Sequence, residues 1–335
     1  MDTTIQHQPV IDVHVHFHPN MSEQVVQVME VNNLIGVGNM GSLERLGIPF
    51  EEGIRQFRNT FGDRMAYFST PDFNDVAPGF GQRMADILEH KVERGVRGLK
   101  IFKELGLVFK DAEGRLIPID DARLDPLWAK AGALGVPVLI HTADPYAFFL
   151  PLMPDNERWD ELHVHPDWHF GRPGFPDHDT LLEQRNRVIA RHPNTTFIGA
   201  HLGNYPEQLD YVAGCLERYP NFYVDTSARL GEIGRHPAED VRRFFVKCQD
   251  RVLFGTDWVL GWREFAAGDA ATTGLDGNFE DRYAAHWRFF ETDDRGIEYP
   301  EYPSQGRWTV DAVDLPDEVL RKLYRENAQR LIGGF

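Results

Sequence analysis

The stretch Val10-Ile11-Asp12-Val13-His14-Val15-His16-Phe17 decides the fold and the kind of site that the sequence predicts. Apart from Asp12 and the two histidines it is apolar and rich in valine, which is typical of a strand buried on both faces. Alternate side chains of a strand point the same way, so His14 and His16 share one face, about 7 Å apart along the strand. Two imidazoles on one rigid strand can bind a single metal ion. For this stretch alone, two hydrogen-bonded core histidines are the alternative interpretation.

Short apolar runs alternate with helical patterns along the rest of the 335 residues. The predicted strands are residues 10–16, 33–37, 65–70, 96–102, 136–142, 195–202, 222–226 and 251–256, and the predicted helices include residues 82–94, 123–134, 181–191, 207–218, 240–248 and 316–332. Eight strands separated by helices are the pattern of a (β/α)8 or TIM-type barrel of the α/β class. The sequence therefore predicts one barrel domain over residues 1–335 rather than two domains.

Two predicted connections are much longer than the others. One covers about residues 143–179 after the fifth strand, and the other covers about residues 258–315 after the eighth. Both leave the C-terminal ends of strands, where a barrel of this type has its active site. We therefore expect two insertions that form pocket walls or lids, with insertions that have no role in the site as the alternative.

Composition excludes several classes of protein. The 35 Lys and Arg residues against 52 Asp and Glu residues give a net charge of −17, which disfavours nucleic acid and anionic membrane surfaces as partners. The two cysteines are far apart and form no CxxC pair, so no disulfide framework is expected. No apolar run approaches the roughly 20 residues of a membrane span, and the first nine residues lack the apolar core of a signal peptide. We expect a cytoplasmic protein with a small-molecule substrate, and a homodimer is left open.

Side chains that can bind a metal ion follow three other predicted strands. His141 ends the fifth strand, His201 ends the sixth, and Asp257 follows the eighth, each after an apolar run. The C-terminal ends of barrel strands meet at one face, where these side chains could join His14 and His16. Imidazole and carboxylate ligands without a thiolate suit Zn, Fe, Mn or Co better than Ca or Mg. The four strand ends together predict a metal centre.

The glycine-rich stretch Gly36-Val37-Gly38-Asn39-Met40-Gly41 matches the GxGxxG pattern of dinucleotide-binding proteins. That function needs a long helix directly after the glycines and an acidic residue at the end of the next strand. Here the following helical pattern is short, and the strand at residues 65–70 ends without an acid. We interpret the glycines as a tight loop near the pocket instead.

With these motifs the sequence resembles the amidohydrolase superfamily, and most closely the branch typified by aminocarboxymuconate-semialdehyde decarboxylase. The resemblance lies in the His-x-His strand, the later single histidines and the Gly-Thr-Asp at residues 255–257, and it extends to residues 315–318 and 324–328 near the end. It implies that His14, His16, His141 and Asp257 bind the metal, and that His201 acts as a general acid and base. One divalent transition metal is implied, with Zn as first choice and Mn, Fe or Co as alternatives.

Lys100 ends the fourth predicted strand. In some binuclear relatives a lysine at this position is carboxylated and bridges two metals, whereas in the resembled branch it more often stays free. A free ammonium could attract an anionic substrate. A lysine that only marks the end of a strand is the third interpretation. We favour one metal and a substrate-binding Lys100.

Three further side chains are candidates for substrate contact. Arg229 follows the seventh strand and could bind a carboxylate, with an ion pair to Glu232 or Asp225 as the alternative. Trp168 and Trp258 lie in the two long connections, where aromatic side chains suit a flat substrate or simply pack.

The implied chemistry supports two related reactions. A divalent ion lowers the pKa of bound water and polarises a carbonyl, and Asp257 beside that water can accept its proton. We therefore expect a metal-dependent hydrolase of an ester, lactone or amide-like bond. A non-oxidative decarboxylase of a small unsaturated or aromatic acid is the alternative, because it uses nearly the same residues. A binding protein with an inactive site is the third hypothesis.

Overall fold

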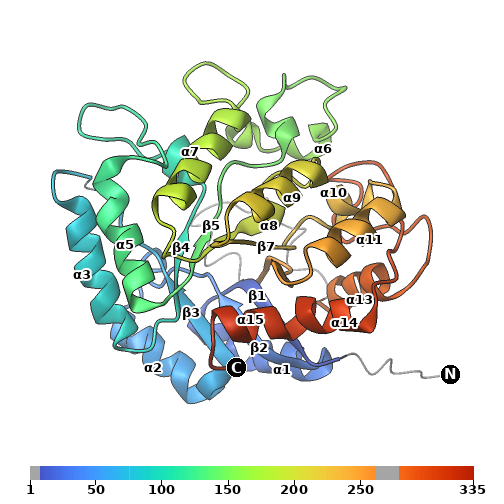
Figure 1. Cartoon of the computed structure of the whole chain (residues 1–335), viewed down its shortest axis with the longest axis horizontal. Helices are drawn as coiled ribbons and strands as arrows, with labels where there is room; N and C mark the ends of the chain where they lie inside the picture. The colour runs from blue at the N-terminus through green and yellow to red at the C-terminus, as the bar shows by residue number, and fades with distance from the viewer. Residues whose placement is uncertain (1–7, 75, 261–278) are drawn as a thin grey trace.

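Every predicted strand corresponds to an observed one in the computed structural model, which describes residues 8–74, 76–260 and 279–335 (Figure 1). In this described part, nine parallel strands form one sheet in the order β8-β7-β6-β5-β4-β3-β2-β1-β9. They are β1 (Val10–Phe17), β2 (Leu34–Asn39), β3 (Met65–Ser69), β4 (Gly98–Ile101), β5 (Val138–Ile140), β6 (Phe197–Gly199), β7 (Phe222–Asp225), β8 (Val252–Leu253) and β9 (Trp258–Leu260). The sheet and its surrounding helices confirm the TIM-type barrel.

The last two strands close the barrel, because β8 pairs with β7 and β9 pairs with β1. Between them the chain still contacts β1: the N–H of Val13 donates to the carbonyl of Phe254 at 3.0 Å, and the N–H of Asp257 donates to the carbonyl of His14 at 2.8 Å. The predicted single strand at residues 251–256 is therefore wrong in its second half. The chain bends there because Asp257 adopts a left-handed conformation with φ 58°.

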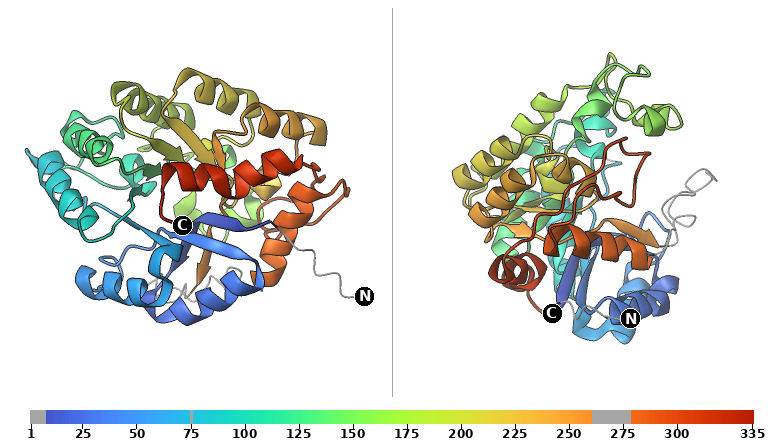
Figure 2. Two further views of the ribbon diagram at one scale, coloured as in Figure 1. Left: turned by 60° about the horizontal axis from the view of Figure 1, so that its bottom comes forward. Right: turned by 90° about the vertical axis from the view of Figure 1, so that its right-hand side faces the viewer.

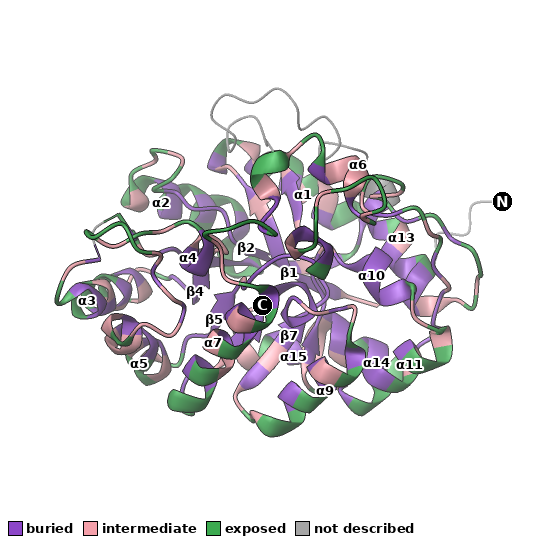
Figure 3. Ribbon diagram, turned by 90° about the horizontal axis from the view of Figure 1, so that it is seen from above, coloured by how far each residue is buried: buried purple, intermediate pink, exposed green. Residues whose placement is uncertain are grey.

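Helices cover the outside of this sheet, with their outward faces exposed and the strands buried (Figure 3). The longer ones are α1 (Ser22–Val31), α2 (Phe50–Phe61), α3 (Phe80–Val92), α5 (Asp125–Leu134), α7 (His178–Arg191), α9 (Leu209–Arg218), α11 (Ala238–Lys247) and α13 (Phe279–Glu291). The last predicted helix consists of α14 (Asp317–Arg321), a π-helical turn (Lys322–Glu326) and α15 (Asn327–Leu331). None of the helices in the described ranges has the length and apolar character needed to cross a bilayer.

Strand β1 changes the phase of its side chains halfway along. Ile11 and Val13 pack in a small inner cluster of the barrel, whereas Val15 and Phe17 pack in the larger outer core. The register with β2 shifts between Asp12 and Val15, where this change occurs. Strict alternation over the whole strand would not bring both Val13 and His14 to the inside. Because of this irregularity, the first half of β1 directs apolar side chains to the inside of the barrel, and the second half directs its histidines there.

The GxGxxG glycines serve strand packing and not a loop. Gly36 and Gly38 lie inside β2, and a Cβ atom on Gly38 would stand 2.4 Å from the carbonyl oxygen of Val13 in β1. The expectation of a tight loop was therefore wrong for these two positions. The missing side chain of Gly38 allows β1 and β2 to approach closely at the irregular part of β1, whereas Gly36 leaves room for the ring of Phe335.

The first long connection is well defined. Between β5 and α7 it contains α6 (Trp159–Leu162) and two 3-10 helices (Tyr146–Phe149 and Pro166–Trp168), and α6 lies well away from α14 and α15 (Figures 1 and 2). The second connection includes α13, but its residues 261–278 fall outside the described ranges. The insertion boundaries, the single-domain assignment and a lid role for either segment stay predictions.

Replacing Gly38 by Ala is expected to lower the free energy of unfolding by about 1–3 kcal/mol, because the new methyl group meets the β1 backbone. Gly214 in α9 is the matched control, since a Cβ there has no neighbour within 4 Å. Gly214→Ala should raise the free energy of unfolding by up to about 1 kcal/mol. Urea denaturation followed by circular dichroism measures both, and equal stabilities for the two variants would contradict this account of Gly38.

Candidate metal centre and the residues around it

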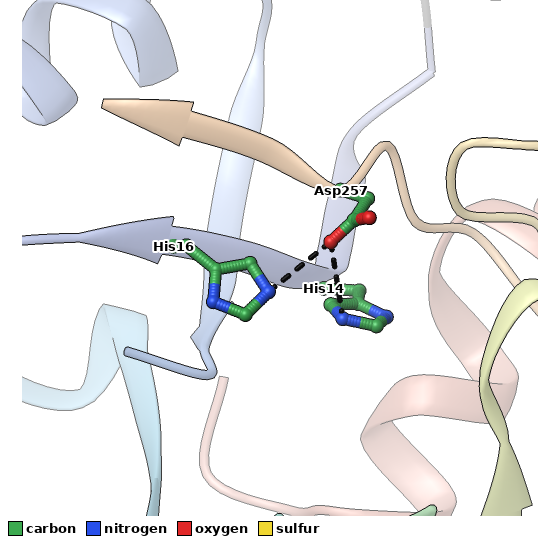
Figure 4. Close-up of side chains that lie close together, drawn as sticks. All are labelled: His14, His16 and Asp257. Carbon is green, nitrogen blue, oxygen red and sulfur yellow. Dashed lines mark ion pairs between the residues drawn. The ribbon is translucent and has the colours of Figure 1, made fainter. Parts of the chain in front are cut away.

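Three of the predicted metal-binding residues meet at one end of β1. The Oδ1 atom of Asp257 lies 3.3 Å from Nε2 of His14 and 3.1 Å from Nε2 of His16 (Figure 4). One ligand atom from each residue lies within 4.8 Å of the others. Two imidazole nitrogens and one carboxylate oxygen form a donor set that suits Zn, Mn, Fe or Co. The residues therefore fit a divalent transition metal.

Sharp turns after the strands aim side chains at this cluster. Ala143, His201, Ala228 and Asp257 follow β5, β6, β7 and β8, and all four have positive φ values between 50° and 65°. Residues other than glycine rarely adopt this conformation, and it concentrates at functional sites. Here it turns the chain a few residues beyond each strand, and His201 and Asp257 lie at the barrel mouth.

His14 is oriented by Asp225, which ends β7. Nδ1 of His14 lies 2.9 Å from Oδ2 of Asp225, and the hydroxyl of Ser227 lies 2.9 Å from the same nitrogen. A carboxylate only accepts hydrogen bonds, so Nδ1 carries the proton and the lone pair of Nε2 faces the cluster. Burial tends to raise the pKa of Asp225, but its contacts with His14 and Ser227 outweigh that and lower it.

The sequence prediction missed this role of Asp225 and offered it only as a partner of Arg229. Its place at the end of β7 was the available signal, because the other residues of the site also follow strands. Ser227 has no such signal in the sequence. Its hydroxyl lies 3.0 Å from Nδ1 of His201 and 2.5 Å from Oδ1 of Asp225, contacts that require the folded β6–β7 edge.

Lys100 places its ammonium group inside the cluster, 3.0 Å from Nε2 of His14. The side chain is almost completely buried, and burial lowers its pKa to about 8. A lysine that only marks the end of a strand would not have these surroundings. The structure thus removes that interpretation and leaves the free ammonium and the carboxylated form.

His201 lies beside the cluster, with its ring 5.2 Å from that of His14. Its Nδ1 lies 2.9 Å from the carbonyl oxygen of Ser227, so this nitrogen donates and Nε2 has the lone pair. Nε2 lies 3.9 Å from Oδ2 of Asp257. Burial lowers the pKa of His201 well below its ordinary value, which keeps the ring neutral. Burial raises the pKa of Asp257, but His14 and the other neighbouring imidazoles outweigh it and keep this carboxylate ionised.

His141 lies beside His201 and outside the three-residue cluster. Its Nδ1 is 3.3 Å from Nε2 of His201, and its Nε2 is 3.5 Å from Oδ1 of Asp144. Asp144 in turn pairs with Lys103 at 2.6 Å. Burial lowers the pKa of His141 to about 4, so its ring is neutral and able to donate a lone pair. As fourth ligand, His141 stays a proposal.

Arg229 is buried, and neither of its predicted ion-pair partners contacts it. Glu232 pairs with Arg158, while Asp225 bonds to His14. One Arg229 nitrogen donates to the carbonyl of Ala228 at 2.7 Å, and Nε has no hydrogen-bond partner among the residues that the structure describes. The predicted structural ion pair was therefore wrong. An incompletely bonded guanidinium close to the cluster is suited to an anionic ligand.

The two tryptophans differ in position. Trp258 is fully buried in the outer core, stacked on Phe17, and its indole N–H donates to the hydroxyl of Tyr283 at 2.5 Å. The expected substrate contact of Trp258 was therefore wrong, because β9 directs this ring away from the barrel mouth. Trp168 is partly exposed, stacks on His165 and lies under the ammonium of Lys103, so its substrate contact stays a proposal.

A cavity of about 620 Å³ lies on the other side of the barrel wall. Leu99 lines it, while the next residue of β4, Lys100, points to the cluster. The ring of Phe102 stands between the two spaces, 6.1 Å from the ring of His16 and 4.4 Å from the guanidinium of Arg45. None of the metal-cluster residues lines this cavity.

Comparisons with known proteins agree with this architecture. A family model described as amidohydrolase matches residues 70–334, a range that includes Lys100, His141, His201 and Asp257 but not β1. No curated protein sequence matches the chain.

Many solved structures share the fold, and three of them, at 10–16% sequence identity, illustrate the range. A 2,6-dihydroxybenzoate decarboxylase from Rhizobium has a TM-score of 0.56 and 16% identity, over 97% of this chain and 99% of that one. A dihydroxybenzoic acid decarboxylase from Polaromonas sp. JS666, with bound manganese and 2-nitroresorcinol, has a TM-score of 0.58 and 15% identity, and the match covers 97% of both chains. A probable 2-pyrone-4,6-dicarboxylic acid hydrolase from Acinetobacter baumannii, with citric acid bound, has a TM-score of 0.55 and 10% identity. This match covers 97% of this chain and 100% of that one.

The His14→Ala variant is expected to lose a bound transition metal, whereas His201→Ala should retain it. His14 supplies a nitrogen that faces the cluster, while His201 lies beside the opposite oxygen of Asp257. Removing one ligand of three or four should weaken affinity by at least about 100-fold. Elemental analysis after dialysis against a chelator of known affinity measures this. Full metal retention by folded His14→Ala would exclude His14 as a ligand.

Proposed function

The chain belongs to the amidohydrolase family, and we propose that it is a metal-dependent hydrolase of a small anionic molecule that carries an ester, lactone or amide-like bond. The observation that carries the proposal is the cluster of His14, His16 and Asp257 with the neutral imidazole of His201 beside the second oxygen of Asp257. This arrangement combines a metal site with two separate proton acceptors.

The protein's own groups suit the proton transfers of hydrolysis. When bound, the divalent ion would polarise the substrate carbonyl and make water more acidic. Asp257 is ionised, so it can accept the proton of the attacking water. Nε2 of His201 has a lone pair because Nδ1 donates to Ser227, so it can take up a proton and return it to the leaving group.

Two buried cations favour an anionic substrate. Lys100 reaches the cluster from β4. Arg229 approaches from the start of α10 (Leu230–Gly234), and its Nε–H donates to no residue that the structure describes. In a buried site, charge-assisted bonds to a carboxylate are stronger than bonds between neutral groups. These two residues thus overcome the net charge of −17 locally.

A decarboxylase is the second candidate, and the same two cations support it, because such an enzyme must bind a carboxylate. Loss of CO2 leaves an electron pair on carbon, and this carbon must then receive a proton. His201 is neutral at rest, so it could supply that proton only after Nε2 has taken one up. Two of the three solved structures described above are named as decarboxylases of dihydroxybenzoates, and one of them contains manganese. We keep Zn as the first choice of metal, with Mn, Fe or Co next, and a second metal on carboxylated Lys100 as a less favoured form.

The cytoplasmic location, the homodimer and the role of Trp168 stay predictions. A small-molecule substrate follows from the family and from the buried, polar character of the cluster. The acidic charge continues to disfavour nucleic acid and anionic membranes.

Product analysis decides between the two reactions. The metal-loaded protein is incubated with a panel of carboxylated lactones and esters and, separately, with dihydroxybenzoic acids. We expect acid release from the first panel, measured with a pH indicator, and no CO2 from the second, measured by infrared gas detection. CO2 release without hydrolysis would replace the hydrolase by the decarboxylase, and His201→Ala should abolish whichever activity is found.

Arg229→Met should raise KM for a carboxylated substrate by about 10- to 100-fold, because one charge-assisted contact is lost. The KM for the matching methyl ester should change little. The exposed Arg187, which pairs with Asp120 far from the cluster, provides the control substitution Arg187→Met. Equal effects on the charged and the neutral substrate would contradict a carboxylate-binding role for Arg229.

A further inference from the structure

Asp12 is a buried carboxylate that neither the metal cluster nor the proposed proton transfers use. Its side chain has no exposed surface. Oδ1 accepts the backbone N–H groups of His14 at 3.1 Å and Thr256 at 3.2 Å. Oδ2 accepts the hydroxyl groups of Thr256 at 2.6 Å and Tyr283 at 2.7 Å. Four donors surround this carboxylate, and no cationic side chain of the described residues forms an ion pair with it.

These donors come from three separate segments that meet around the metal cluster. His14 belongs to β1 and is itself a predicted ligand, while Thr256 directly precedes the ligand Asp257. Tyr283 belongs to α13, and its hydroxyl also accepts the indole N–H of Trp258, the residue directly after Asp257. Asp12 thus contacts the chain on one side of Asp257 directly and on the other side through Tyr283.

A carboxylate is costly to bury. Here it accepts hydrogen bonds from backbone N–H groups that have no partner in the regular sheet. The chain is bent between β8 and β9, and the register of β1 shifts between Asp12 and Val15. At this irregular junction the N–H groups of His14 and Thr256 both point to one oxygen of Asp12. Buried backbone donors need such an acceptor. The distance between β1 and the bend therefore depends on Asp12.

We propose that Asp12 is a positioning residue that sets the separation of His14 and Asp257 and thereby the metal affinity of the cluster. The inference rests on the proposed metal site. Its physical basis is that one rigid acceptor joins the backbone of the first ligand to the backbone next to the second. A direct backbone bond, from the N–H of Asp257 to the carbonyl of His14, completes the connection.

The substitution Asp12→Asn tests this role, because an amide has nearly the same shape but only one accepting oxygen. Its NH2 group would face either two N–H groups or two hydroxyl groups. Tyr283→Phe removes one donor and leaves the ring stacked on Trp287. Thr195→Val is the matched control. The buried hydroxyl of Thr195 donates one bond to the carbonyl of Trp128, and the residue lies just before β6, at the end of that strand away from the cluster.

Titration of the full-length protein with Co2+ in competition with a chelator measures affinity without a substrate, and the visible Co2+ spectrum reports the ligand geometry. We expect Asp12→Asn to weaken Co2+ binding by about 10- to 100-fold and to alter the spectrum at saturation. Tyr283→Phe should weaken binding by several-fold, and Thr195→Val should leave both unchanged despite its own loss of stability.

Folded Asp12→Asn with wild-type affinity and spectrum would overturn the inference. If Asp12→Asn does not fold, an unchanged affinity and spectrum of Tyr283→Phe would overturn it equally. Weaker binding by Thr195→Val, to the same degree as by Tyr283→Phe, would show that general destabilisation and not positioning is the cause. Wild-type protein that binds no Co2+, Zn2+ or Mn2+ would instead overturn the proposed metal site itself.

Discussion

The contact between β1 and the bent end of the eighth strand is the interaction on which the rest of the structure depends. The backbone bonds from Val13 to Phe254 and from Asp257 to His14 close the sheet. The same two segments carry His14, His16 and Asp257. The segments that close the barrel therefore also carry the candidate metal ligands, and a change that shifts this seam is expected to alter both. Gly38 of β2 contributes on the other edge of β1 by letting the neighbouring strand approach.

Burial determines the protonation of the site. It lowers the pKa values of His16 and His141 to about 4, so their rings are neutral near pH 7 and can act as ligands. Asp257 stays ionised because several imidazoles face it, and Lys100 loses part of its preference for the charged form. Neutral imidazoles and an ionised carboxylate are the forms that bind a metal ion, and the pKa shifts of His16, His141 and Asp257 favour these forms.

Charge is distributed unevenly between the site and the rest of the molecule. The chain as a whole is acidic, yet Lys100 and Arg229 are both buried near the cluster, and the carboxylates expected to neutralise Arg229 bond elsewhere. The site therefore differs in charge from the molecule as a whole. Asp12 stands apart from this arrangement, because its hydrogen bonds join backbone segments and serve geometry rather than charge.

Local pattern alone determined the barrel and most of the residues at its mouth. Apolar runs reveal buried parallel strands, and a histidine or aspartate at the end of such a run must lie at the C-terminal face, so His14, His16, His201 and Asp257 could be found from the sequence. The tertiary structure decided the rest. The bend before Asp257, the core position of Trp258, the pairing of Asp225 with His14 and of Glu232 with Arg158, and the four donors of Asp12 all join residues distant in the chain. Such pairings depend on how strands and helices pack in three dimensions, so they cannot be inferred from the spacing of residues along the sequence.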